Sequence, residues 1–124
     1  MSTIVTGSIA FDNIMDFPGK FADHILPDKI HILNVSFLVK GLKKQRGGTA
    51  GNIAYTLGLL GDRPLLFSTA GQDFAGYQQE VEAVGVDTHA VKILSDDFTA
   101  ICYITTDEVN NQITGFYPGA MAQD

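Results

Sequence analysis

The stretch QRGGTAGNIAYTLGLLGD, residues 45–62, places two adjacent glycines and an asparagine directly before an apolar run with helical spacing. The run predicts a helix over 50–60, because its apolar residues recur on one face. That face holds Ile53, Ala54, Leu57 and Leu60. Gly61 follows, where helices commonly end with a left-handed residue. Gly58, inside the run, costs about 1 kcal/mol relative to alanine, so we expect a close packing contact there.

Strands and a second helix are expected on both sides of this helix. Segments 3–9 and 63–71 are rich in β-branched and apolar residues and predict buried strands. Segment 73–85 predicts an amphipathic helix, with Asp73 as its N-cap and Gly85 as its stop. The order strand, helix, strand, helix is typical of a parallel sheet with crossover helices.

An antiparallel hairpin interrupts this order. Segments 98–107 and 112–118 predict two strands joined at Asn110-Asn111, residues that tolerate the positive φ of a tight turn. A further strand is expected at 34–41. No helix follows the hairpin, although a parallel sheet usually needs helices on both faces. We therefore expect that another chain completes the sheet, or that the sequence is the N-terminal part of a longer protein.

Composition excludes several classes of protein. The 124 residues carry a net charge of −6, which argues against a nucleic-acid surface. The cations clustered at 40–46 predict a solvated loop. The single cysteine, Cys102, allows no intrachain disulfide and has apolar neighbours typical of a buried thiol. No window reaches the roughly 20 apolar residues that span a bilayer, and no secretory signal is seen, so we expect a cytoplasmic protein.

The glycine junction at 47–52 leaves two interpretations open. A P-loop is excluded because no lysine follows Gly51, and the spacing does not fit a dinucleotide-binding fingerprint. The junction could be a loop that needs glycine for positive φ, with Thr49 capping the helix. It could instead be a site for a polyol.

The polyol interpretation rests on the chemistry of three groups. Adjacent glycines expose backbone N–H groups and let a ligand approach without a Cβ in the way. Asn52 both donates and accepts hydrogen bonds, as a sugar hydroxyl does. Asp12, just after the first strand, would supply the carboxylate that accepts from a vicinal diol. The carboxyl ends of parallel strands and the helix N-termini share one edge of a sheet, so these groups would converge.

Four pieces occur in order along the chain: TGSIAFD ending at Asp12, Gly47-Gly48-x-x-x-Asn52, the turn at 71–76, and TDEVNNQITGFYPGA. Together they resemble the ribokinase-like (PfkB) carbohydrate kinases over essentially the whole chain, most closely the nucleoside and adenosine kinase branch. The resemblance implies an α/β fold. Residues 1–124 would form the N-terminal part of a ribokinase-like three-layer core. A small β-sheet lid, made of segments at about 13–18, 34–40 and 98–117, would close over the sugar.

The resemblance also implies roles for individual residues. Asp12 would accept hydrogen bonds from ribose hydroxyls, Gly47 and Gly48 would donate backbone N–H groups, and Asn52 would bind a hydroxyl. Phe116 would lie against a base or sugar face, with a core or interface aromatic as the alternative. The lid commonly takes part in dimer contacts, which implies a homodimer. The three histidines lack ligand spacing, so we expect no metal site within these residues.

The implied activity is ATP-dependent phosphorylation of the primary hydroxyl of a nucleoside such as adenosine, with ATP and Mg²⁺ as requirements of the full-length protein. The family's second signature, D-T-x-G-A-G-D, is not in the sequence. In the family it supplies the catalytic base, the anion hole and much of the ATP site. We therefore expect no catalytic residue in 1–124 and no activity of the isolated chain. Two alternatives stay open: a kinase for a free sugar such as ribose or fructose, and a non-catalytic binding or assembly module.

Overall fold

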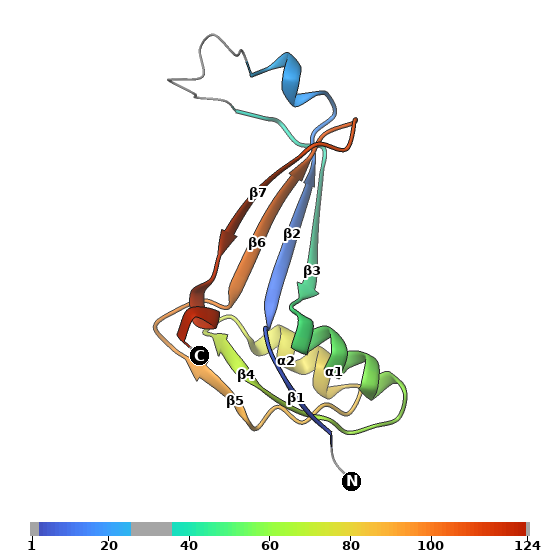
Figure 1. Ribbon diagram of the computed structural model, residues 1–124, viewed down its shortest axis with the longest axis vertical. Helices are drawn as coiled ribbons and strands as arrows, with labels where there is room; N and C mark the ends of the chain where they lie inside the picture. Colours follow the sequence, from blue (N-terminus) through green and yellow to red (C-terminus); the bar gives the residue numbers. More distant parts are fainter. Residues whose placement is uncertain (1–2, 26–35, 124) are drawn as a thin grey trace.

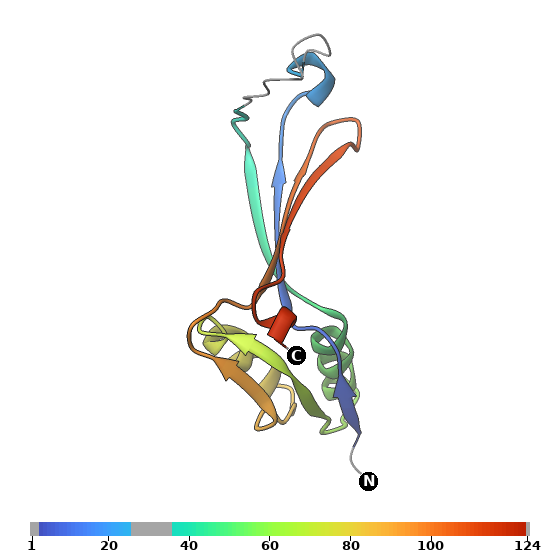
Figure 2. The same ribbon diagram turned by 60° about the vertical axis from the view of Figure 1, so that its left-hand side comes forward.

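A computed structural model describes residues 3–25 and 36–123, which form two sheets and two α-helices (Figure 1). The first sheet is parallel, in the order β1-β4-β5, with bounds β1 Ile4–Thr6, β4 Leu65–Gly71 and β5 Val91–Leu94. The helices are α1, Thr49–Leu59, and α2, Ala75–Glu82. Figures 1 and 2 show both on the same side of this sheet. The predicted parallel sheet with crossover helices is confirmed, and β5 is an additional strand.

The second sheet rises away from the first, as Figures 1 and 2 show, and has the order β3-β2-β6-β7. Its strands are β2 Ala10–Asp16, β3 Gly41–Gly47, β6 Ala100–Thr106 and β7 Gln112–Tyr117. Strand β2 is antiparallel to β3 and parallel to β6, and β6 and β7 form the predicted antiparallel hairpin. Asn110 has φ 65° in the connecting turn, as expected. Two short 3₁₀ helices, η1 (Phe21–Asp23) and η3 (Gly119–Gln123), complete the described elements.

Strand β3 corrects two expectations. Residues 34 and 35 of the strand predicted at 34–41 lie outside the described residues, and 36–40 form no strand. The strand begins only at Gly41 and includes Lys43, Lys44 and Arg46, which we had expected in a solvated loop. Its composition is polar because β3 is an edge strand, and charged side chains on an edge discourage pairing with other chains. Pairing with β2 along its whole length makes it a strand despite this composition.

The core lies between the parallel sheet and the two helices. Val5, Leu66, Ala70 and Val91 from the strands pack against Ala50, Ala54, Phe74, Tyr77 and Val81 from the helical side. The predicted apolar face of α1 is wrong in part: Ile53 is 54% and Leu60 78% exposed, and the buried residues are Ala50, Gly51, Ala54 and Gly58. Small residues let α1 pack closely. A Cβ on Gly58 would lie 2.7 Å from the Val84 carbonyl oxygen, which is the close contact expected there.

The helices end as predicted but begin differently. Gly61 (φ 93°) and Gly85 (φ 99°) follow α1 and α2 as left-handed stops. Thr49 is the first residue of α1 rather than its cap, and its N–H donates to the Ser8 hydroxyl at 2.9 Å. Asp73 does not cap α2 either. Its Oδ1 accepts from the Thr99 N–H at 2.9 Å, so the carboxylate joins α2 to the base of β6.

The other face of the parallel sheet is partly exposed. Ile4 is 65% and Phe67 58% exposed, and a cavity of about 540 Å³ lies beside Phe67, Thr69 and Lys92. The prediction of a buried first strand therefore holds for Val5 but not for Ile4. Within the described residues, neither α-helix has the length and apolar character needed to cross a bilayer.

Candidate functional site

Asp12 and Gly47 lie against each other on adjacent strands. Ala10 of β2 is paired with Gly47 of β3, and Asp12 is paired with Gln45. A Cβ added to Gly47 would lie 2.8 Å from Asp12 Oδ2 and 3.0 Å from its Cγ. The Asp12 carboxylate therefore occupies the space that any larger residue at position 47 would fill. Two predicted site residues that lie 35 positions apart in sequence are thus brought into contact.

Gly48 follows directly and turns the chain into α1. Its φ is 87°, and a Cβ would lie 2.5 Å from the Ser8 carbonyl oxygen, so both conformation and space call for glycine. The Ala50 N–H donates to the Ser8 carbonyl at 3.0 Å, and the Asn52 N–H donates to the Gly48 carbonyl at 3.0 Å. The first N–H groups of α1 are thus used inside the protein. Contacts to a ligand are left to the glycine pair and to side chains.

Phe116 lies in the same sheet as Asp12, whereas Asn52 lies in helix α1. Asn52 is exposed on the first turn of α1, one helical turn after Gly48. Phe116 is 53% exposed on β7, directly opposite Cys102, and Cys102 is directly opposite Asp12. Directly paired residues project from the same face of a sheet, so Asp12, Cys102 and Phe116 form one row about 10 Å long. The expectation of a buried thiol is wrong, because Cys102 is only half-buried in this row.

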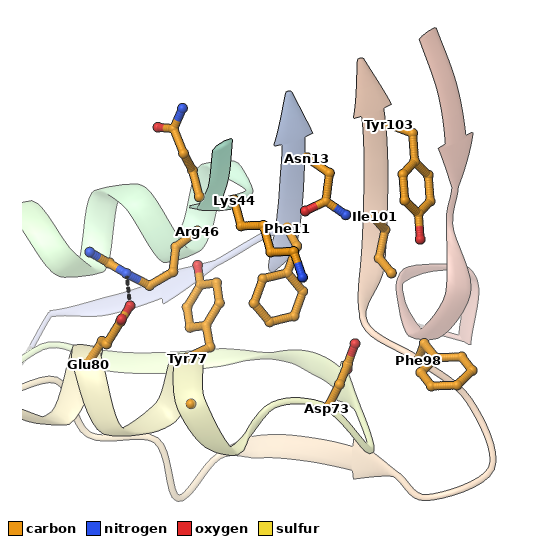
Figure 3. Close-up of a pocket in the computed structure, with 12 residues that line it drawn as sticks. Phe11, Asn13, Lys44, Arg46, Asp73, Tyr77, Glu80, Phe98, Ile101 and Tyr103 are labelled. Atoms are coloured by element: carbon orange, nitrogen blue, oxygen red, sulfur yellow. Dashed lines mark ion pairs between the residues drawn. The ribbon is translucent and has the colours of Figure 1, made fainter. Parts of the chain in front are cut away.

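The opposite face of the second sheet borders a separate cleft of about 560 Å³ (Figure 3). Strand residues Phe11, Asn13 and Tyr103 line it on one side, and Asp73 and Tyr77 line it from the α2 side. None of the five predicted site residues lines this cleft. The reason is the two-residue period of a strand, which sends Phe11 and Asn13 to one face and Asp12 to the other.

Tyr77 connects the cleft to the glycine pair, a role that sequence reasoning missed. The buried hydroxyl of Tyr77 donates to the Gly47 carbonyl oxygen at 2.8 Å. Burial raises the pKa of Tyr77 to about 12, with the nearby Arg46 guanidinium opposing the shift. Arg46 forms an ion pair with Glu80 of α2 (Figure 3). Its guanidinium lies 4.0 Å from the centre of the Tyr55 ring. The sequence signals this role only through the spacing of Tyr77 and Glu80, one helical turn apart, and through Gly51 inside α1.

The start of strand β6 is also held by residues at or near α2, as the end of β3 is. Thr99, just before β6, is fully buried, and its hydroxyl accepts from the Gly71 N–H at 2.9 Å. Its own N–H donates to Asp73, as described above. Residues 71–80 therefore hold the bases of both β3 and β6. Among the described residues, no group of three or more His, Cys, Asp and Glu side chains is placed to bind a metal ion.

A known protein family matches most of the chain. The family model described as pfkB family carbohydrate kinase matches residues 15–124. The chain belongs to the pfkB family. That match includes Gly47, Gly48 and Asn52, whereas Asp12 lies just before the matched residues.

Several proteins similar to this pfkB chain are nucleoside kinases. The nucleoside kinase of Methanothermobacter thermautotrophicus is 33% identical over 119 residues, which is 94% of this chain and 35% of that protein. The ligand-free structure of Burkholderia thailandensis nucleoside kinase is 49% identical with a TM-score of 0.82, covering 98% of this chain and 41% of that one. Its complex with inosine gives 46% identity and a TM-score of 0.76, with 98% of this chain and 38% of that chain covered. The chain thus spans about two fifths of these relatives at most.

Proposed function

We propose that this chain is the substrate-binding part of an ATP-dependent kinase that phosphorylates the primary hydroxyl of a nucleoside. The observation that carries the proposal is the contact between the Asp12 carboxylate and the bare backbone at Gly47. A carboxylate accepts hydrogen bonds from both hydroxyls of a vicinal diol, and hydrogen bonds to a charged group are stronger than neutral ones. The adjacent glycine backbone adds N–H donors where no Cβ blocks the pentose.

A nucleoside, rather than a free sugar, is the substrate that the surroundings of Asp12 favour. Phe116 lies on the same face two strands away, at a distance suited to the base of a nucleoside whose ribose contacts Asp12. Burkholderia thailandensis nucleoside kinase, 46% identical to this chain, has been solved in complex with inosine and with ADP-inosine. Adenosine and inosine are therefore the first substrates to test, because both present the same ribose diol.

The division of labour follows from which groups the chain supplies. Phosphoryl transfer depends on positioning and on charge stabilisation at the transferring group, supported by Mg²⁺ on the phosphates of ATP. Residues 3–25 and 36–123 supply the acceptor side: Asp12, the glycine pair, Asn52 and Phe116 hold the nucleoside. We infer that the catalytic base and the groups that bind ATP lie outside residues 1–124. The isolated chain would therefore transfer no phosphoryl group.

We further propose that the second sheet is the lid. It covers the pentose with its Asp12 face and so excludes water during transfer.

The other face of the second sheet carries exposed apolar side chains, namely Leu42, Tyr103, Ile113 and Tyr117 at 45–58% exposure. Such a patch on a sheet face suits a homodimer. In the kinase containing this chain, Ile113→Asp should lower the molecular mass measured in solution from that of a dimer to that of a monomer. An unchanged mass would argue against this interface.

The experiment that tests the function uses the kinase containing this chain, assayed with ATP against adenosine, inosine and ribose. We expect transfer to both nucleosides, and a loss of at least a hundredfold in kcat/KM when Asp12 is replaced by Ala, because the diol loses its acceptor. Turnover of ribose with none of the nucleosides would replace this proposal by a sugar kinase. Absence of transfer to all three, with nucleoside binding intact, would favour a binding module.

A further inference from the structure

Tyr77 has little freedom to place its hydroxyl anywhere but against Gly47. The side chain is 2% exposed, and its ring meets Phe11 edge-on at 5.6 Å and Phe74 at 5.4 Å between ring centres. From this fixed ring the hydroxyl donates to the Gly47 carbonyl oxygen at 2.8 Å. Figure 3 shows the ring rising from α2 beside Phe11, toward the strands.

Gly51 provides the space for this hydroxyl. A Cβ at Gly51 would lie 1.6 Å from Tyr77 Oη and 2.8 Å from Cζ. Gly51 lies inside α1 without a positive φ, so its backbone conformation does not call for glycine. The lack of a side chain at Gly51 is therefore explained by the Tyr77 hydroxyl. Tyr77 of α2 and Gly51 of α1 thus both allow the hydrogen bond to the Gly47 carbonyl: Tyr77 donates it, and Gly51 leaves room for the hydroxyl.

The hydrogen bond fixes the direction of a second group. In a planar trans peptide, the carbonyl of Gly47 and the N–H of Gly48 point in opposite directions. Tyr77 packs with Phe11 on one face of the β2–β3 pair, and the Asp12 carboxylate lies against Gly47 on the other. A Gly47 carbonyl that accepts from Tyr77 therefore leaves the Gly48 N–H directed away from the Tyr77 hydroxyl.

We propose that Tyr77 is a positioning residue for nucleoside binding, which holds the Gly47–Gly48 peptide so that the Gly48 N–H meets a pentose hydroxyl beside Asp12. This inference rests on the proposed function. Without the hydroxyl, the buried Gly47 carbonyl loses this hydrogen bond, and the Gly47–Gly48 peptide is held less firmly at the end of the β2–β3 pairing. Because burial raises the pKa of Tyr77 to about 12, the hydroxyl stays protonated and remains a donor near neutral pH.

The test is Tyr77→Phe in the kinase containing this chain, with the KM for inosine and the KM for ATP measured separately. The ring and its packing stay, so we expect the KM for inosine to rise about tenfold or more, the cost of one misdirected hydrogen bond. The KM for ATP should stay within twofold. Thr3→Val is the control, because it also removes a hydroxyl hydrogen bond, to Asp62 at 3.1 Å, at an exposed position before β1 and outside the proposed site. It should leave both KM values unchanged.

Gly51→Ala provides a second route to the same loss, because its Cβ displaces the Tyr77 hydroxyl without altering Tyr77. Calorimetry should show that Gly51→Ala binds inosine more weakly than the unaltered kinase. The double variant, Gly51→Ala with Tyr77→Phe, should lose less affinity than the product of the two single losses, because both changes break the same hydrogen bond. An unchanged inosine KM in Tyr77→Phe, equal rises in both KM values, or fully multiplicative effects would overturn the positioning role. If the unaltered kinase binds and phosphorylates no nucleoside, the proposed function fails instead.

Discussion

Replacing Gly47 by Ala should separate the fold of this protein from its affinity for a nucleoside. The added Cβ would lie 2.8 Å from Asp12 Oδ2, about 0.6 Å short of the 3.4 Å at which ordinary contact begins. Gly47 lies in β3 without a positive φ, so its backbone accepts alanine. The group that must move is the end of the Asp12 side chain, which can rotate away at little cost to the fold.

The expected magnitude follows from the hydrogen bonds that the displaced carboxylate would lose. A hydrogen bond to a charged group contributes about 1.5–3 kcal/mol. Each 1.4 kcal/mol is about a factor of ten in affinity. Loss of one of the two contacts to the diol therefore predicts a Kd for inosine that rises by about tenfold to a hundredfold. The melting temperature should change by only a few degrees, because overpacking at this position is relieved by one side chain.

Calorimetry with inosine and thermal unfolding, both on the kinase containing this chain, measure the two effects. Gly115→Ala is the matched control: it makes the same change in β7 of the same sheet, where a Cβ would meet nothing within 4 Å. That variant should bind inosine normally. If Gly47→Ala also binds inosine normally, the Asp12 carboxylate is not held against the pentose, and the reasoning from the β2–β3 contact is refuted.

Three further predictions concern the two helices and the end of the second sheet. Gly58→Ala should lower the free energy of unfolding by about 1–3 kcal/mol, because its Cβ would meet the Val84 carbonyl at 2.7 Å. Gly76→Ala, in open space on α2, should raise it by about 0.5–1 kcal/mol in the same denaturation experiment. Burial raises the pKa of Asp107, but hydrogen bonds from Phe21 and nearby backbone outweigh it and lower the pKa overall. The ionised Asp107 carboxylate therefore stabilises the fold at any pH above the ordinary pKa of an aspartate, about 3.9. This contribution is lost as the pH falls through the lowered pKa of Asp107. Amide exchange at Phe21 should accelerate in that acidic range, and Asp107→Asn should abolish the dependence.

The sequence predicted best where local chemistry and topology agree. The strand–helix–strand–helix order indicated the parallel sheet, and the glycines after α1 and α2 marked their ends. Strand β3 was missed because its residues are polar, and its extended form depends on pairing with β2, which lies about 30 residues earlier in the chain. The buried face of α1 was misjudged for a related reason. Hydrophobicity favoured Ile53 and Leu60, whereas close packing selects the small residues Gly51 and Gly58.

The same contrast applies to the candidate site. That Asp12 meets the glycine pair could be predicted from the sequence, although the contact forms through the antiparallel pairing of β2 and β3 and not at the edge of the parallel sheet as expected. Tyr77 could not, because a tyrosine on an amphipathic helix reads as a core residue, and only the structure brings its hydroxyl to the Gly47 carbonyl. Gly51 carried a hint, since a glycine inside a helix lowers stability unless something occupies the missing side chain's place. A helical glycine three residues after a glycine pair is therefore a reason to search the neighbouring helix for a polar group that holds the pair.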